Sequence, residues 1–164
     1  MKKILFSIIA TLFLSVGTSF GQVEFSKFTF KKDSPMGMYP TRKMTDTKFK
    51  ITSDRALKYI RVYYYGVDQV NDAVSSDIYG AVNANAEPTK YNMINFTGPF
   101  EPGKKYSRWA SGSFFYKMKV TSFPFRIELK YMDGEEEVID ITKENLPKFF
   151  PCLKWIDVNV KDGI

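Results

Sequence analysis

The stretch Leu57-Lys58-Tyr59-Ile60-Arg61-Val62-Tyr63-Tyr64-Tyr65, residues 57–65, indicates the fold class most clearly. Its side chains alternate with a period of two, which is the periodicity of an extended strand. One side of such a strand would carry Ile60, Val62 and Tyr64. The other side would carry Tyr59, Arg61, Tyr63 and Tyr65. We therefore predict a β-strand with one face in the core and an aromatic opposite face.

Most of the chain beyond residue 22 shows the same alternation, or short apolar runs between Gly, Pro, Asn and Asp. The stretch 31–47 is rich in Pro, Gly, Met and charge, and we expect a long irregular connection there. A slip between Phe25 and Phe28 predicts a bulge. The other predicted strands are 23–30, 49–51, 74–78, 93–97, 113–121, 125–131, 135–141 and 155–160. We predict an all-β fold, an antiparallel immunoglobulin-like β-sandwich of about eight strands, with a closed barrel as the structural alternative.

One hairpin allows its register to be predicted. Asp133-Gly134 reverses the chain between two alternating stretches, the first of which has Phe125, Ile127, Leu129 and Tyr131 on one face. A two-residue loop would place Ile127 opposite Asp140. A three-residue loop, 132–134, aligns Ile127 with Ile139. Because a slip of one residue turns every side chain to the other face, we predict the three-residue loop.

A single short helix is expected near residues 142–148. Thr142 is the expected N-cap, Glu144 lies in the first turn, and two prolines, Pro147 and Pro151, limit its length. The strand of residues 93–97 is expected to stop at Gly98-Pro99.

The first 21 residues have the pattern of a secretory signal peptide. Lys2 and Lys3 precede an apolar run, residues 4–16, and small residues precede a cut before Gln22. The alternative, a membrane anchor, needs a run of roughly 20 apolar residues. No cysteine stands at the cut to carry a lipid. We expect residues 1–21 to be removed, residues 22–164 to form a single secreted or periplasmic domain, and no stable membrane insertion.

Composition excludes several kinds of chemistry. The chain has 164 residues, no histidine and one cysteine, so it lacks a Ser-His-Asp triad, an imidazole metal ligand and an intramolecular disulfide. Cys152 lies in the apolar run 149–153 and is expected to be buried. The excess of 24 Lys+Arg over 18 Asp+Glu is mild and dispersed, so no nucleic acid is expected as partner. We expect no cofactor, no metal and no catalysis.

The candidate binding residues are aromatic. Tyr59, Arg61, Tyr63 and Tyr65 would form a platform with one guanidinium, on which a sugar ring or a peptide side chain could stack. The alternative is that the tyrosines pack beneath residues 31–47 or in cross-strand aromatic pairs. Trp109, in the polar segment 106–112, is a second candidate contact, unless it folds back over the end of the sandwich.

Two acidic groups could in principle bind calcium. One lies between residues 133 and 137 and the other between residues 68 and 77. The first group lacks the spacing of an EF-hand loop, so a solvated hairpin tip is expected there. For the second group, turn capping by Asx side chains is the expected structure.

Four motifs in order resemble a known group of domains. They are residues 59–63 (YIRVY), 67–74 (VDQVNDAV), 97–104 (TGPFEPGK) and 127–134 (IELKYMDG). This order resembles the small immunoglobulin- or fibronectin-type-III-like β-sandwich domains of unknown function in secreted bacterial proteins. The resemblance covers residues 49–141 and implies a fold. It implies no reaction and no catalytic residue.

These observations favour an exported, non-catalytic binding or structural protein of the bacterial cell envelope, whose partner would be another envelope protein. The alternative is a carbohydrate-binding module that uses the tyrosine face and Trp109. A third hypothesis is a small hydrolase that works through paired carboxylates. The oligomeric state is left open.

Overall fold

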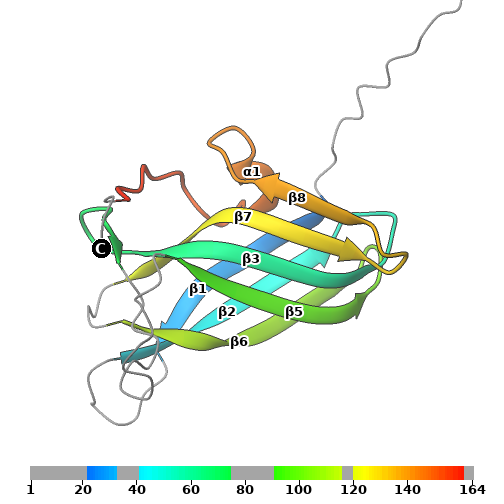
Figure 1. Cartoon of the computed structure of the whole chain (residues 1–164), viewed down its shortest axis with the longest axis horizontal. Helices are drawn as coiled ribbons and strands as arrows, with labels where there is room; N and C mark the ends of the chain where they lie inside the picture. The colour runs from blue at the N-terminus through cyan, green and yellow to red at the C-terminus, as the bar shows by residue number, and fades with distance from the viewer. Residues whose placement is uncertain (1–21, 33–40, 75–90, 116–119, 161–164) are drawn as a thin grey trace, which may run out of the picture.

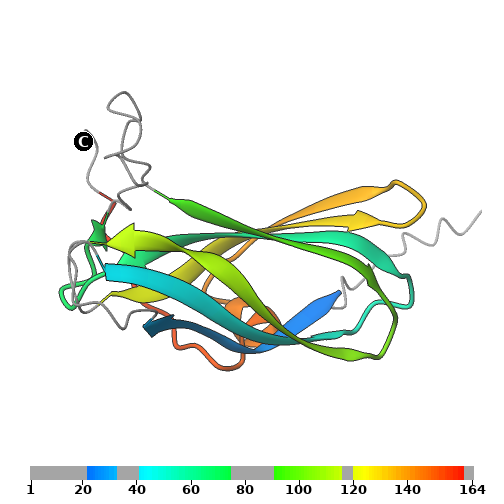
Figure 2. The same cartoon turned by 90° about the horizontal axis from the view of Figure 1, so that it is seen from below.

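The computed structural model of the chain describes residues 22–32, 41–74, 91–115 and 120–160. The predicted signal peptide, residues 1–21, lies outside these residues. Within these ranges, eight strands form two antiparallel sheets, and one short helix follows the last strand. The strands are strongly twisted, and one sheet curls into a half-barrel (Figures 1 and 2). The prediction of an all-β fold with about eight antiparallel strands and one short helix is confirmed at this level.

Sheet A contains three strands in the order β1-β2-β6. Strand β1 is Val23–Lys32, β2 is Thr41–Ile51 and β6 is Lys105–Phe115. The inward side chains of β1 and β2 include the fully buried phenylalanines of the core, Phe25, Phe28 and Phe49. The register of β1 on β2 shifts after Phe25, so the predicted bulge is confirmed.

Sheet B is built around β3, Leu57–Val67, and crosses in front of sheet A in Figure 1. One edge of β3 pairs along its length with β7, Thr121–Tyr131, which in turn pairs with β8, Glu136–Asp140. The other edge of β3 pairs with β5, Asn92–Phe100, and with the short β4, Ala73–Val74. The five-stranded sheet therefore presents β5, β3, β7 and β8 side by side.

The alternation predicted for β3 is present. Ile60, Val62 and Tyr64 are buried, whereas the side chains between them are only partly covered. Burying an aliphatic side chain of this size contributes about 1.5–3 kcal/mol, so burial in the core stabilises β3 with this face turned inward.

The β7–β8 hairpin has the predicted register. Ile127 is opposite Ile139, and the Tyr131 amide donates to the Glu135 carbonyl at 2.9 Å across a three-residue loop. Gly134 has a φ of +97°, in the region that side chains rarely adopt. The prediction of a three-residue loop is confirmed.

In the stretch expected to be irregular, residues 31–47, the described parts 31–32 and 41–47 are strand: β1 runs to Lys32 and β2 starts at Thr41, and residues 33–40 lie outside the described ranges. The expectation rested on the Pro, Gly, Met and charge of the whole stretch, and it overlooked the alternation of Thr45 and Thr47. Both are fully buried, and they alternate with the outward Asp46 and Lys48. Thr is β-branched and favours strands, so it continues the alternation of Phe49 and Ile51.

Two strand boundaries also differ from the prediction. Strand β6 covers the polar segment 106–112, for which no strand was predicted, and β7 begins only at Thr121. A single strand over 113–121 is therefore wrong. Strand β5 continues through Gly98-Pro99 to Phe100, which is possible because β5 is an edge strand, where a proline removes no ladder bond.

The C-terminal segment is not the predicted strand. Residues 155–160 form one isolated bridge, between Asp72 and Asn159. Asn145 occupies the N-cap position of the helix α1, Leu146–Phe149, without a capping bond from its side chain, and the expected cap at Thr142 is wrong. Phe150 stacks on Phe25 of β1 with ring centroids 4.7 Å apart, and Trp155 meets Phe123 of β7 edge-on at 5.4 Å. Apolar contact with both sheets therefore holds this segment, in place of strand pairing.

Candidate functional site

The outward side chains of β5, β3, β7 and β8 form one continuous surface, which we call the sheet B face. The strand register orders it in rows: Tyr63 is opposite Met93 and Arg126, Arg61 is opposite Asn95 and Glu128, and Tyr59 is opposite Thr97 and Lys130. The face comprises Tyr59, Arg61, Tyr63, Tyr65, Tyr91, Met93, Asn95, Thr97, Phe125, Arg126, Glu128, Lys130, Glu136, Val138 and Asp140.

An aromatic cluster occupies one end of this face. Tyr65 and Phe125 stack with their centroids 4.5 Å apart, and Tyr91 meets Phe125 edge-on at 5.7 Å. Tyr63 lies 6.0 Å from Tyr91. The cross-strand aromatic contacts weighed as an alternative for the tyrosines are therefore present. The cluster still faces solvent in part, because Tyr91 is 49% exposed.

Phe125 was expected on the core face with Ile127, and this was wrong. The β3–β7 register shifts between the pairs Tyr63–Arg126 and Tyr64–Pro124, which leaves Phe125 without a partner. Such a bulge redirects a side chain. Phe125 consequently joins the tyrosines of the sheet B face.

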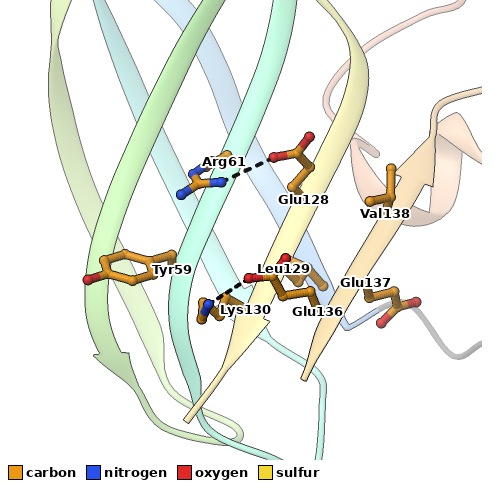
Figure 3. Close-up of a pocket in the computed structure, with 8 residues that line it drawn as sticks. All are labelled: Tyr59, Arg61, Glu128, Leu129, Lys130, Glu136, Glu137 and Val138. Carbon is orange, nitrogen blue, oxygen red and sulfur yellow. Dashed lines mark hydrogen bonds and ion pairs between the residues drawn. The ribbon is translucent and has the colours of Figure 1, made fainter. Parts of the chain in front are cut away.

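Ion pairs and hydrogen bonds connect the middle of the face. The Arg61 Nη1 lies 3.4 Å from Glu128 Oε2, and the same oxygen accepts a hydrogen bond of 3.0 Å from the Tyr63 hydroxyl. The Lys130 Nζ lies 2.6 Å from Glu136 Oε1 (Figure 3). Exposed pairs of this kind contribute about 0–1 kcal/mol each. Their main effect here is to hold the charged groups in fixed positions.

The pKa values of two groups reflect these contacts. Burial, and then the bond to Glu128, raises the pKa of the Tyr63 hydroxyl above its ordinary value. The hydrogen bond from Lys130 lowers the pKa of Glu136. Both groups therefore keep their usual protonation state at neutral pH, the tyrosine neutral and the carboxylate charged.

A groove of about 130 Å³ lies along β3, β7 and β8 (Figure 3). It is lined by Tyr59, Arg61, Glu128, Leu129, Lys130, Glu136, Glu137 and Val138. Sites for small molecules usually enclose about 300–1,000 Å³. The groove is therefore a surface depression suited to a side chain or a single sugar ring.

The described acidic residues of the two groups considered for calcium have protein partners. At the hairpin tip, Arg55 pairs with Asp133 at 2.6 Å and with Glu135 at 2.8 Å, so the expected solvated tip carries a bridging arginine. Asp68 Oδ1 accepts from the amides of Val70 and Asp72, which is the expected Asx capping. Within the described ranges, no group of three or more His, Cys, Asp or Glu side chains could hold a metal ion.

Trp109 lies apart from the tyrosines. It is opposite Asp46 on the outer side of sheet A and is 59% exposed, so it does not fold back over the end of the sandwich. The structure thus brings Tyr59, Arg61, Tyr63 and Tyr65 together and places Trp109 on the other sheet.

Cys152 is exposed, so the expectation of a buried hydrophobe was wrong. Phe149 and Phe150 take the buried positions, and the turn at Pro151 brings Cys152 to the surface. Its Sγ remains 3.2 Å from the Phe25 carbonyl oxygen, and partial burial raises the pKa of the thiol.

Several members of the sheet B face were missed in the sequence. Met93 is 49% exposed and Val138 is 60% exposed, and they lie on β5 and β8 at the two sides of the face. The alternation Met93-Ile94-Asn95-Phe96 could have placed Met93 outward. Only the strand order shows that it stands beside Tyr63.

Comparisons with models of protein families and with curated proteins found no match for this chain. In the described part of the chain, no helix is long and apolar enough to cross a membrane. The candidate site is therefore defined by its geometry.

Proposed function

We propose that the chain is an exported, non-catalytic binding protein of the bacterial cell envelope, and that the sheet B face binds another envelope protein. The observation that carries this proposal is the composition of the face: Tyr and Arg on its middle strands β3 and β7 and Met at its β5 side, partly exposed and side by side. These residue types are enriched in protein–protein interfaces. Tyrosine combines a large apolar area with a hydroxyl that can find a partner.

The charge arrangement supports a protein partner as well. The three basic groups Arg61, Arg126 and Lys130 are each paired with a carboxylate of the same face. Such a face has no net charge, and its charged groups are already ordered before binding. The free-energy cost of association is then smaller, because fewer side chains have to be ordered and fewer unpaired charges have to be desolvated.

A carbohydrate-binding module remains the second candidate. The groove places the ring of Tyr59 beside Arg61 and Glu128, which could bond to sugar hydroxyls. The geometry of the aromatic cluster at the other end of the sheet B face supports a carbohydrate ligand less. Tyr65 and Phe125 are stacked on each other at an interplanar angle of 24°, so the facing sides of these rings are not available to a sugar.

The non-catalytic part of the proposal is supported by the carboxylates. A general acid in a glycosidase needs a raised pKa. The bond from Lys130 moves the pKa of Glu136 in the opposite direction. Glu128 is held by Arg61 and Tyr63, and Glu137 accepts a 2.7 Å bond from Tyr131.

We also propose that the fold is immunoglobulin-like. The strand order supports this: lettered along the chain, β1, β2 and β6 correspond to A, B and E, and β8, β7, β3 and β5 correspond to G, F, C and C′. A solved structure with a different order of strands would contradict it.

Export is supported by the signal-like residues 1–21. N-terminal sequencing of the protein recovered outside the cytoplasm should begin at Gln22. A protein that keeps its first 21 residues, or stays in the cytoplasm, would contradict the export proposal.

The binding proposal is tested by affinity capture from a cell-envelope fraction, followed by titration of the captured protein. Truncation of a hot-spot residue costs at least about 2 kcal/mol, roughly 30-fold in affinity. Tyr63→Ala should weaken binding by about this factor, and Trp109→Ala on the opposite sheet should not. Capture that is equal for both variants would refute the assignment. A signal on a glycan array that Tyr59→Ala abolishes would favour the carbohydrate alternative.

A further inference from the structure

The outer side of sheet A contains a second and larger groove, of about 490 Å³. We call it the lysine groove. Its outward lining side chains are Lys48, Lys50, Lys105, Ser26, Ser107 and Glu24, from all three strands of the sheet. It shares no residue with the sheet B face, so the inference below does not depend on the proposed function.

The strand register brings the three lysines together. Lys50 is directly opposite Lys105 on one side and Glu24 on the other. Lys48 is two residues from Lys50 on the same face and opposite Ser107. Directly opposite side chains have Cβ atoms about 5 Å apart, and residues i and i+2 lie about 7 Å apart along a strand. Flexible lysine side chains can therefore direct three ammonium groups to one point.

This arrangement lacks internal compensation. In the described part of the chain, none of the three lysines has an ion pair, whereas the neighbouring Lys27 is paired with Asp46. Like charges directly opposite each other destabilise a sheet. Three basic groups face one acid, Glu24, so the groove attracts anions. Binding an anion there reduces the repulsion among the three lysines.

We propose that the lysine groove binds the phosphate group of an anionic ligand. The ammonium group is a compact point charge that binds phosphate well, and several ammonium groups at one point match the charge of about −1.5 to −2 on a phosphate group better than the single charge of a carboxylate. The groove is lined by three lysines and by no arginine, and the Ser107 hydroxyl adds a donor. Its volume admits a phosphate together with the atoms attached to it. The source of the phosphate is a soluble phosphate ester or a lipid headgroup.

Titration calorimetry with phenyl phosphate, and sedimentation with vesicles of phosphatidylcholine with or without phosphatidic acid, separate the two sources. Both are measured at low ionic strength and well above the second phosphate pKa of about 6. Removing one charge at contact distance in water should weaken binding about fivefold for Lys50→Gln or Lys105→Gln. Glu24→Gln should tighten it by a similar factor. Lys154→Gln, an exposed lysine outside the groove, is the matched control.

Lysine-dependent binding of phenyl phosphate would support a soluble phosphate ester. Binding only to vesicles with phosphatidic acid, with the same dependence on Lys50 and Lys105, would support a lipid phosphate. The proposal is overturned when neither probe binds, or when Lys154→Gln weakens binding as much as Lys50→Gln does. It is also overturned when Glu24→Gln weakens binding.

Discussion

Replacement of Phe150 by alanine tests whether the C-terminal segment belongs to the core. The side chain is fully buried. Its ring stacks on Phe25 at an interplanar angle of 8° and meets Phe28 edge-on at 5.3 Å. Removing a buried phenylalanine side chain costs about 3–5 kcal/mol, and a domain of this size has about 5–15 kcal/mol in total. Phe150→Ala should therefore remove a large part of the free energy of unfolding.

Urea unfolding, followed by circular dichroism and tryptophan fluorescence, measures this loss. Because Phe150→Ala could fail to fold, Phe150→Leu is the second variant, with an expected loss of about 1–2 kcal/mol. Val138→Ala, at an exposed position, is the control and should change the free energy by no more than about 0.5 kcal/mol. A Phe150→Ala protein within about 1 kcal/mol of the parent would refute the packing argument.

Three further changes have predicted outcomes. Tyr131→Phe removes a hydroxyl that donates to the partly buried Glu137 at 2.7 Å and should cost about 1 kcal/mol in urea unfolding. Burial and then this bond raise the pKa of Tyr131 above its ordinary value of 10.0, so the hydroxyl's contribution to stability is complete below that pH and is lost as the pH rises through the higher folded-state pKa. The parent should therefore lose more stability than the variant in strong alkali. Parallel curves of unfolding free energy against pH for the two proteins would argue against this. Gly98→Ala would place a Cβ 2.6 Å from both the Leu57 carbonyl oxygen and the Phe100 nitrogen, so its melting temperature should fall by the equivalent of about 1–3 kcal/mol, and an unchanged value would be inconsistent with this close approach. Lys105→Gln relieves the repulsion with Lys50 and should raise the free energy of unfolding by about 0.2–0.5 kcal/mol at low salt, whereas a decrease would speak against unpaired like charges.

The predictions that the structure confirms rest on local pattern. Strand β3 has a core face of Ile60, Val62 and Tyr64, and no other period fits that stretch. The β7–β8 register follows from a short loop and from the requirement that Ile127 and Ile139 share a face. Both depend on residues that are near one another in the chain.

The predictions that failed depend on partners distant in the chain. Thr45 and Thr47 look polar in the sequence and are buried because β1 and β6 flank them. Phe125 turns outward because of a bulge set by pairing with β3. Residues 155–160 alternate like a strand, but apart from the single bridge at Asn159 they contact the core through side chains and do not pair along the edge of a sheet.

The candidate site was likewise predictable only where it depends on local pattern. The four residues that β3 contributes to the sheet B face follow from the alternation of one strand. Their neighbours Met93 and Val138 come from strands β5 and β8, and Tyr91 directly precedes β5; the order of these strands in the sheet cannot be read from a local sequence pattern. The separation of Trp109 from the tyrosines likewise follows from the crossing of the chain from sheet B to sheet A between β5 and β6.

Site-specific photo-crosslinking in cells tests most directly whether the sheet B face binds a protein. A photoreactive phenylalanine derivative would replace Met93 or Val138, which are exposed at the two sides of the face, and Val70, which is 68% exposed and lies outside it, as the control. We predict the same discrete crosslinked product from positions 93 and 138, absent at position 70 and lost when Tyr63→Ala is added. No product from positions 93 and 138, or an equal product from position 70, would contradict the account.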